Sequence, residues 1–239
     1  MAVWQSISDT LIDEIEKGVL TAGGRLPADA DLAIRFGVNR HTVRRALSHL
    51  QAQGLVRSER GRGTFVVEDA IAYRFGAQTR FEENLRANMR IPSRRLLSFA
   101  EYGAPEAVAR QLRIKPGDPV LMATLLGEAD GIPVHLFRAY FSCRRFPGIG
   151  DVFKSLPVAR SSNVSLADLL AKVGVKSFRR KAARLRCRLP DTEEARHLGM
   201  SRSDPILDTE ILNVDEKNRP VFFGVTCYCG SRIEFVFDY

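Results

Sequence analysis

The sequence has no stretch that would cross a membrane and little that would build a disulfide framework. Among its 239 residues no apolar run approaches the roughly 18 residues of a membrane-spanning helix, so a membrane protein is not expected. No basic segment followed by an apolar core opens the chain, which favours the cytoplasm over secretion. The four cysteines form no C-x-x-C pair, and we expect free thiols at Cys143, Cys187, Cys227 and Cys229.

Signatures of enzymatic chemistry are also missing. Neither a Walker A loop nor a G-x-G-x-x-G sequence follows a predicted strand, which leaves no nucleotide-binding loop. His135 and His197 have no neighbouring serine or cysteine motif that would mark a nucleophile and its base. Cys227 and Cys229 lack a second pair of ligands at metal-binding spacing. We therefore predict no catalytic residue, no metal site and no cofactor, and we expect His135 to pack in the core.

The distribution of positive charge along the chain indicates where a nucleic acid would bind. The chain carries 36 Lys and Arg against 28 Asp and Glu, a formal net charge of +8, and 29 of the 36 are arginine. Residues 1–38 have a net charge of −3, whereas residues 39–67 have six arginines and one glutamate, a net charge of +5. Arginine suits bidentate contacts with phosphates and guanine edges, so residues 39–67 are the candidate nucleic-acid-binding segment. A second cluster, Arg184, Arg186 and Arg188, alternates along a predicted strand, and we expect it to be a solvated face.

Three amphipathic helices are predicted in the first 53 residues. Apolar side chains recur at helical spacing over residues 4–17 and again between Pro27 and Gly37. Asn39 is placed to cap a third helix, which Gly54 ends. The core stripe of this helix comprises Val43, Ala46, Leu47 and Leu50. Two such helices joined by a glycine-containing turn are typical of a helix-turn-helix.

The polar face of the third helix is basic. The side chains that project from its first two turns are Arg40, His41, Arg44 and Arg45. In a recognition helix those turns enter the major groove and meet base edges. Two strand-like runs, residues 55–60 and 64–67, follow this helix. The Gly61-Arg62-Gly63 sequence between them predicts a β-hairpin with an arginine at its tip. Such an arginine can enter the narrower minor groove.

This order of elements resembles the winged helix-turn-helix of the GntR family of bacterial transcription regulators. The resemblance extends from Ile7 to Val67 and is carried by the runs 24–27, 37–47, 54–56 and 61–66. It implies a regulator, expected to be a repressor, that binds double-stranded operator DNA as a homodimer. With the basic positions above, the DNA-binding residues that it implies are Asn39, Arg40, His41, Thr42, Arg44, Arg45, Arg60, Gly61, Arg62, Gly63 and Thr64.

The remainder of the chain predicts an α+β domain built on an antiparallel sheet. Residues 69–80 lack a clear period and are predicted to link a domain at 1–68 to a second at 81–239. Strands are expected at 95–102, 120–127, 134–143, 181–189, 206–214, 221–229 and 233–237. Helices are expected at 82–88, 105–112, 164–173 and 192–198. The Asp130-Gly131 dipeptide between two strands predicts a hairpin.

This second domain resembles the UTRA effector-binding domain of the HutC subfamily, whose fold is shared with chorismate lyase. The resemblance is sharpest over residues 73–85, at Tyr140-Phe141 and over residues 232–235, and it is strongest to regulators of phosphonate utilisation. It implies dimerisation through this domain and binding of a small anionic effector, a phosphonate or a related compound. The effector-binding residues that it implies are Arg80 and Ser165 first, and then Arg138, Tyr140, Tyr228 and Arg232.

Departures from the subfamily pattern leave the effector open. The run Leu125-Leu126-Gly127 stands where many UTRA domains carry Arg-x-Arg. Phe137 and Phe222 stand where acidic residues often face a sugar. A sugar phosphate is therefore not expected, whereas a small phosphonate and a more apolar metabolite both remain. A lyase-like enzyme is the alternative from another class, because the fold is shared with a lyase, but no catalytic motif supports it.

Overall fold

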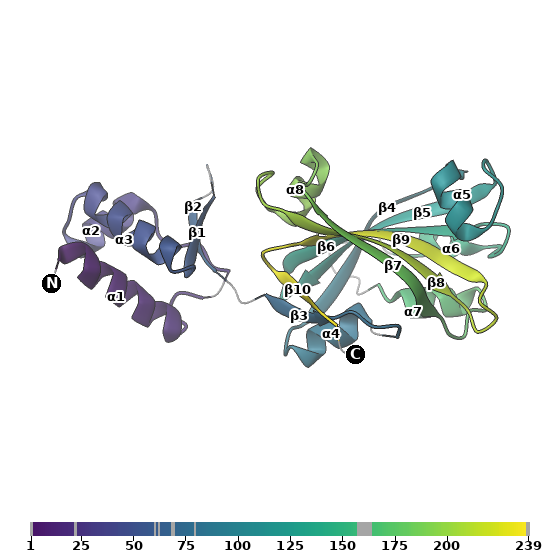
Figure 1. The fold of residues 1–239 in the computed structure, drawn as a ribbon, viewed down its shortest axis with the longest axis horizontal. Helices are drawn as coiled ribbons and strands as arrows, with labels where there is room; N and C mark the ends of the chain where they lie inside the picture. The colour runs from purple at the N-terminus through teal and green to yellow at the C-terminus, as the bar shows by residue number, and fades with distance from the viewer. Residues whose placement is uncertain are drawn as a thin grey trace. The chain divides into compact units, whose positions relative to one another are not determined.

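The computed structural model describes residues 2–21, 23–59, 61, 63–67, 70–78, 80–156 and 164–237. The chain divides into two compact units, Met1–Asp69 and Ala70–Tyr239. Figure 1 shows three helices and a hairpin in the first unit, and a large sheet with flanking helices in the second.

The N-terminal unit is a winged helix-turn-helix, as predicted. Helices α1 (Val3–Glu16), α2 (Asp29–Phe36) and α3 (Arg40–Ala52) precede strands β1 (Val56–Glu59) and β2 (Gly63–Val66), which pair antiparallel. Gly37 takes a left-handed φ of 62° and ends α2, because only a residue without a Cβ adopts that conformation without strain. The apolar stripes of the helices meet in one core, which includes the fully buried side chains of Leu11, Leu32, Val43 and Leu50.

Polar contacts fix α1 against the two helices that follow it. The hydroxyl of Ser8 donates to the backbone carbonyl of Ala46 at 3.1 Å, inside the contact between α1 and α3. The guanidinium of Arg35 in α2 forms an ion pair with the carboxylate of Glu14 in α1. These contacts hold α3 in a defined orientation within its unit.

The C-terminal unit contains a six-stranded antiparallel sheet, which confirms the predicted α+β class. Its strands are β4 (Pro92–Gly103), β5 (Pro119–Ala129), β6 (Ile132–Ser142), β7 (Arg179–Arg188), β8 (Ile206–Val214) and β9 (Pro220–Cys229). Their order across the sheet is β4-β5-β6-β9-β8-β7. Asp130 and Gly131 both have positive φ, 51° and 79°, as the tight turn of the predicted β5–β6 hairpin requires.

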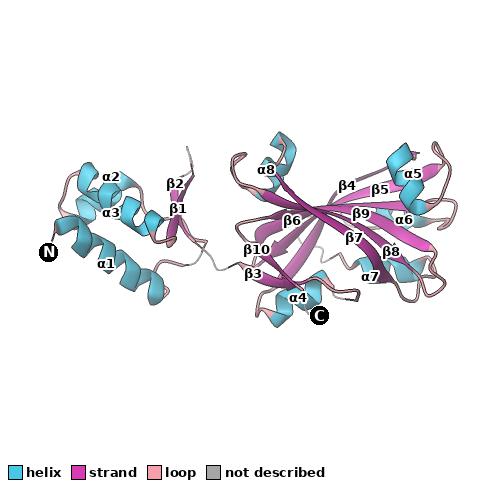
Figure 2. Ribbon diagram, viewed as in Figure 1, coloured by secondary structure: helices cyan, strands magenta, loops and turns pink. Residues whose placement is uncertain are grey.

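Helices cover both faces of this sheet (Figure 2). Helices α5 (Glu106–Leu112) and α8 (Thr192–Leu198) pack on one face, where α8 meets Leu136 of β6 and α5 meets Phe223 of β9. Helices α4 (Phe81–Ala87), α6 (Ile149–Lys154) and α7 (Leu166–Lys172) lie on the other face, which we call the inner face. The main core of the unit lies on the inner face, around Phe137, Phe141 and Phe153.

The segment predicted as a linker, residues 69–80, contains a strand. Strand β3 (Ile71–Arg74) lies within it and pairs in parallel with β10 (Ile233–Val236) in a separate two-stranded sheet. Ile71 and Tyr73 are buried beside α4, so this part of the segment belongs to the core of the C-terminal unit. Strand β10 was expected to close the main sheet, but it pairs with β3 instead. Helix α6 was not predicted, because six residues are too few for a helical period to be read.

Candidate nucleic-acid interface and ligand cavity

The start of α3 is built by the cap that the sequence predicts. The side-chain oxygen of Asn39 accepts hydrogen bonds from the backbone N–H of Thr42 at 2.9 Å and from the Thr42 hydroxyl at 3.0 Å. This satisfies one of the backbone donors that a helix leaves free in its first turn. Asn39 and Thr42 therefore shape the end of the helix that a DNA groove would receive.

The exposed face of α3 carries the expected basic side chains. Arg40, His41, Arg44 and Arg45 are all exposed, whereas the opposite stripe of the helix is buried. Nε of Arg44 donates to Oδ2 of Asp29, in the first turn of α2, at 3.0 Å. The Arg45 guanidinium lies 4.8 Å from the ring centroid of Trp4 in α1. Two of the four basic side chains are thus held by contacts within the unit, while both remain accessible.

The wing follows α3 at the β1–β2 hairpin. Gly61 and Gly63 have φ values of 76° and 111°, a conformation that strains any side chain with a Cβ. The Thr64 hydroxyl lies 3.3 Å from that of Ser58 across the hairpin. Arg60 and Arg62, which we expected to contact DNA, lie outside the described residues.

Arg25 is a candidate that sequence reasoning did not select. Its backbone bridges to Phe65 of β2, and its guanidinium lies so close to Gly63 that a Cβ there would be 2.7 Å from Nε of Arg25. The Arg25 guanidinium therefore lies beside Gly63, at the turn end of the hairpin. Its signal in the sequence was the run Gly24-Arg25-Leu26-Pro27, which we used only for family resemblance.

The C-terminal unit contains a cavity of about 470 Å³ on the inner face of its sheet. Its walls come from α4, the start of α7 and the inner-face side chains of β6, β8 and β9. Arg94 of β4 and Arg180 of β7 reach it from the two edge strands of the sheet. Pockets of about 300–1,000 Å³ are typical of sites for small organic ligands.

Three arginines that line this cavity are held in place by their neighbours. The Arg80 guanidinium lies 3.9 Å from the ring centroid of Phe178 and donates to the Phe178 carbonyl at 2.8 Å. The Arg180 guanidinium lies 3.9 Å from the ring centroid of Phe75 and donates to the Gly76 carbonyl. Nη1 of Arg94 pairs with Oε1 of Glu82 at 2.7 Å. Within the described part of the chain, Arg94 is the one of these three that forms an ion pair.

The charges of these groups act on one another. Burial is the main cause that lowers the pKa of Arg80, and the neighbouring charge of Arg180 lowers it further. Burial also lowers the pKa of His135 well below its ordinary value, with Arg94 adding to the shift, so the imidazole is neutral near pH 7. Burial raises the pKa of Tyr73 and of Tyr228, so both phenols keep their protons. The cavity therefore presents arginines and neutral donors to a ligand, together with the carboxylates of Glu82, Glu83 and Asp168, which also line it.

Four buried nitrogen atoms without a hydrogen-bond partner belong to residues that line this cavity. Among the described residues they are Nε of Arg94, Nδ1 of His135, Nε of Arg180 and Nδ2 of Asn213. Buried polar atoms are nearly always paired in folded proteins, so four unpaired ones around one cavity make it a candidate polar site.

The structure brings together three of the six residues expected to bind an effector. Arg80, Ser165 and Tyr228 line the cavity. Ser165 is the N-cap of α7, where its Oγ accepts from the backbone N–H of Asp168 at 3.3 Å. Arg94, Arg180, His135, Tyr73 and Asn213 line the cavity as well and were not selected from the sequence. His135 packs in the core as expected, and it also faces the cavity.

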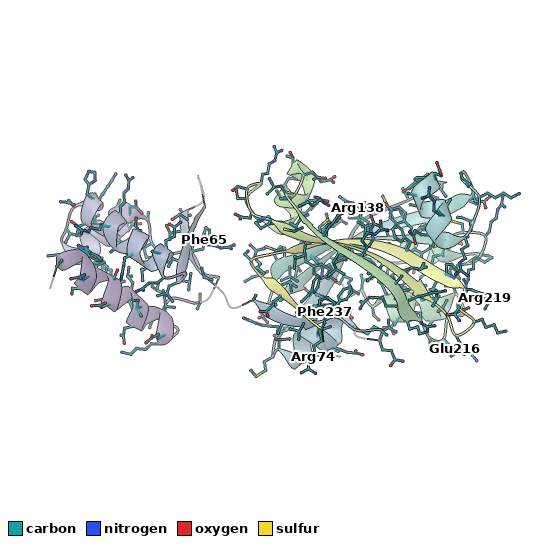
Figure 3. The ribbon with its side chains drawn as sticks, in the orientation of Figure 1. Phe65, Arg74, Arg138, Glu216, Arg219 and Phe237 are labelled. Atoms are coloured by element: carbon teal, nitrogen blue, oxygen red, sulfur yellow. The ribbon has the colours of Figure 1, made fainter. Side chains whose placement is uncertain are left out.

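The other three expected effector residues lie outside the cavity, which corrects the sequence-based assignment. Arg138 and Tyr140 follow Phe137 at odd spacing, so they point to the opposite face of β6, because side chains alternate along a strand. Arg138 pairs with Glu194 of α8 at 3.2 Å, and Figure 3 shows it on the α8 side of the sheet. The Arg232 guanidinium donates to the carbonyls of Pro133 and Leu198, both at 2.7 Å, and serves as a buried structural cross-link.

The arginines of β7 form ion pairs on the outer face of the sheet. Arg186 and Arg188 contact Asp208 at 2.7 and 3.1 Å, and Arg188 also contacts Glu194 at 2.7 Å. The thiol of Cys227 donates to the Glu194 carboxylate at 3.0 Å. Hydrogen bonds from these partners lower the pKa of Glu194 despite its burial, while burial and Glu194 raise the pKa of Cys227. This cluster explains the arginine repeat as a structural network.

None of the helices in the described residues combines the length and the apolar character of a membrane span. No group of three or more His, Cys, Asp or Glu side chains in the described ranges could hold a metal ion.

Comparison with known proteins identifies both units. Residues 4–66 match the model described as "Bacterial regulatory proteins, gntR family", and residues 87–234 match the model of the UTRA domain. An HTH-type transcriptional regulator of Rhizobium meliloti, RB1450, is 30% identical over 235 residues, covering 98% of this chain and 93% of that protein. The probable transcriptional regulator PhnF of Escherichia coli is 29% identical over 237 residues, covering 99% and 95%. The crystal structure of PhnF from Mycobacterium smegmatis has a TM-score of 0.65 and 26% identity, covering 100% of this chain and 99% of that one.

Proposed function

The chain belongs to the gntR family of bacterial regulatory proteins and carries its UTRA domain, and we propose that it is a repressor whose operator binding is controlled by a small anion. Its relatives are transcriptional regulators, a family without enzymatic activity, so the lyase-like alternative is set aside. The proposal places its action in the cytoplasm, where operator DNA is found.

The exposed basic face of α3 supports the DNA-binding part of this proposal. Arg40, His41 and Arg44 occupy its first two turns, where a recognition helix meets base edges. Two protomers that dimerise through their C-terminal units would present two such helices to successive major grooves of a near-palindromic operator. The wing, with Gly61, Gly63 and Arg25 beside it, would follow the sugar-phosphate backbone into the adjacent minor groove.

The three arginines that line one cavity are the single observation that carries the effector part. An anion among Arg80, Arg94 and Arg180 would offset the charge of Arg80 and Arg180, which form no ion pair among the described residues. The resemblance to regulators of phosphonate utilisation makes a phosphonate the first candidate. A ligand that favours one arrangement of the C-terminal units over another would then change how well the two recognition helices fit the operator.

Thermal unfolding with a panel of anions tests the effector part. At constant ionic strength, phosphonates, phosphate, sulfate and amino-sugar phosphates are each added to the full-length protein. A ligand at 100 times its Kd adds about 2.7 kcal/mol of stability, which raises the Tm of a domain this size by about 5 °C or more.

Two variants make the result specific to the cavity. Arg80→Gln is expected to abolish the shift. Arg110→Gln, a change of the same charge on the exposed face of α5, is expected to leave the shift intact. The absence of a response to every anion would refute the anion site.

A further inference from the structure

The cavity has an apolar half that an anion by itself does not use. Five hydrophobic side chains line it, each with an exposed fraction between 3% and 9%: Phe137, Leu166, Phe178, Ile211 and Phe222. They belong to the main core of the unit, so the cavity opens directly onto core side chains. A ligand that fills this half displaces water from a hydrocarbon surface.

The aromatic rings of this half are locked against one another. Phe222 meets Phe137 edge-on, with ring centroids 6.1 Å apart at 70°, and meets Phe178 edge-on at 5.4 Å and 72°. Gly224 of β9 makes room for them, because a Cβ there would lie 2.6 Å from Cε2 of Phe137 and 3.0 Å from Cγ1 of Ile211. The apolar floor is therefore a built surface with a fixed shape.

Polar and apolar side chains lie side by side on this floor. Along the inner face of β6 His135 is followed by Phe137, and along β9 Tyr228 and Thr226 are followed by Phe222. Arg94 of β4 is in register with Gly127, which is paired with His135, whereas Arg80 stacks on Phe178. The cavity thus holds arginines directly beside an aromatic floor.

Two ligand classes fit this lining poorly. A tetrahedral anion with no more than a methyl group would leave most of the roughly 470 Å³ unfilled and would make little contact with the apolar side chains. A sugar phosphate would press hydroxyl groups against Phe137, Phe178 and Phe222, where hydroxyls lose their hydrogen bonds to water.

Building on the proposed function, we propose that the effector is an amphipathic organic anion whose apolar body is the size of a phenyl or branched alkyl group. Its phosphonate or carboxylate group binds among Arg80, Arg94 and Arg180. Its apolar body lies on the floor formed by Phe137, Phe178, Ile211 and Phe222. This deepens the effector assignment from any small anion to one with a hydrophobic substituent.

Calorimetric titration of the full-length protein with a graded series of phosphonates tests this inference. The series is methyl-, propyl- and benzylphosphonate, with 2-aminoethylphosphonate as a polar match for propyl and phenylacetate as a carboxylate match for benzyl. The Kd is expected to fall about tenfold or more from methyl to benzyl, because the ring is removed from water. The aminoethyl compound is expected to bind more weakly than the propyl compound.

Variants separate the cationic lining of the cavity from its apolar lining. Ile211→Thr removes the δ-methyl group and replaces Cγ1 by a hydroxyl, so it is expected to reduce the ratio of the methylphosphonate Kd to the benzylphosphonate Kd and to leave the methylphosphonate Kd unchanged. Arg180→Gln is expected to weaken every member of the series by a similar factor. Arg184→Gln, on the same strand but on its outer, solvent-exposed side, is the matched control and is expected to change nothing.

The outcomes test the amphipathic ligand class and the anion site separately. If all members bind with equal Kd, or the small polar ones bind more tightly, the amphipathic class is wrong while the anion site stands. If phenylacetate binds and the phosphonates do not, the amphipathic class is supported and the phosphonate link fails. If none of them binds and phosphate and sulfate also give no heat, both the inference and the proposed effector site are refuted.

Discussion

Nε of Arg44 donates to Oδ2 of Asp29 at 3.0 Å, so a side chain expected to read DNA is held by the first turn of the preceding helix. The pair is largely exposed, with 68% of the Arg44 side chain and 35% of the Asp29 side chain accessible. Exposed pairs of this kind contribute about 0–1 kcal/mol, so DNA phosphates or base edges can compete for Arg44. Asp29 thus orients the arginine while it adds negative charge beside the N-terminal end of α3.

Asp29→Asn is expected to strengthen operator binding by a factor of about two to five, because it frees Arg44 and removes a repelling carboxylate. Fluorescence anisotropy with an operator selected from random duplexes, at fixed salt, measures this. Asp31→Asn, an exposed carboxylate in the same turn of α2, is the matched control. Weaker binding by Asp29→Asn would show instead that the pair holds Arg44 in its DNA-reading position.

Gly127 is expected to tolerate no side chain, because the ring of His135 occupies the space beside it. A Cβ at Gly127 would lie 2.8 Å from Nδ1 of His135 and closer still to Cε1 and Nε2. Gly127→Ala is therefore expected to lower the free energy of unfolding of the C-terminal unit by about 1–3 kcal/mol. In the double variant with His135→Ala the loss should be smaller than the sum of the two single losses. Urea unfolding followed by far-UV circular dichroism measures all three, and strict additivity would contradict the overlap.

The Glu194 network is expected to make the C-terminal unit sensitive to acid. The folded-state pKa values of Glu194 and Asp208 lie below their ordinary values, mainly through hydrogen bonds from Arg188 and Arg186 that outweigh burial. Groups with a lowered pKa stabilise the fold above their unfolded pKa, about 4 for carboxylates, and that stability is lost as the pH falls further. The Tm of the unit should therefore drop steeply below about pH 4.5.

Glu194→Gln tests this network directly. It removes the buried carboxylate shared by Arg138 and Arg188, of which Arg188 keeps Asp208, so it is expected to cost about 3–5 kcal/mol at pH 7. The variant should then lose less additional stability between pH 7 and pH 3.5 than the parent protein. Glu193→Gln on the exposed side of the same helix is the control, and equal acid sensitivity in all three proteins would refute the assignment.

The thiols are expected to differ in reactivity according to burial. Cys187 is exposed on β7, whereas Cys227 and Cys229 are fully buried and the pKa of Cys227 is raised by burial and by Glu194. A disulfide reagent at pH 8 should therefore react rapidly with Cys187, and Cys187→Ser should remove that fast reaction. Rapid reaction of Cys227 in the native protein would contradict the raised pKa.

Local patterns were sufficient to predict the N-terminal unit. The cap at Asn39, the stripe of α3 and the glycine after α2 are all read within one or two helical turns of sequence. Strands β3 and β10 were missed as a pair because Ile71 lies opposite Ile233, a partner far along the chain. A four-residue strand has too few alternations to be distinguished from a linker.

The cavity was predictable only in part, for a similar reason. Arg94 and Arg180 stand on the two edge strands of the sheet, and only the strand order brings their side chains to one cavity. The sequence alone was sufficient to keep Arg138 out of the set of expected effector-binding residues. Phe137 was already expected to face the effector, and neighbouring residues on a strand face opposite ways.

Operator affinity of Arg44→Ala tests the central claim, that this chain is a DNA-binding regulator that reads its operator through α3. A gel-shift titration at fixed salt compares it with the parent protein and with Arg110→Ala, which removes the same charge from α5 of the C-terminal unit. Loss of a base or phosphate contact should weaken binding by about 1–3 kcal/mol for Arg44→Ala. The Kd of Arg110→Ala should match the parent value. Equal affinity of all three proteins for the operator would contradict the account.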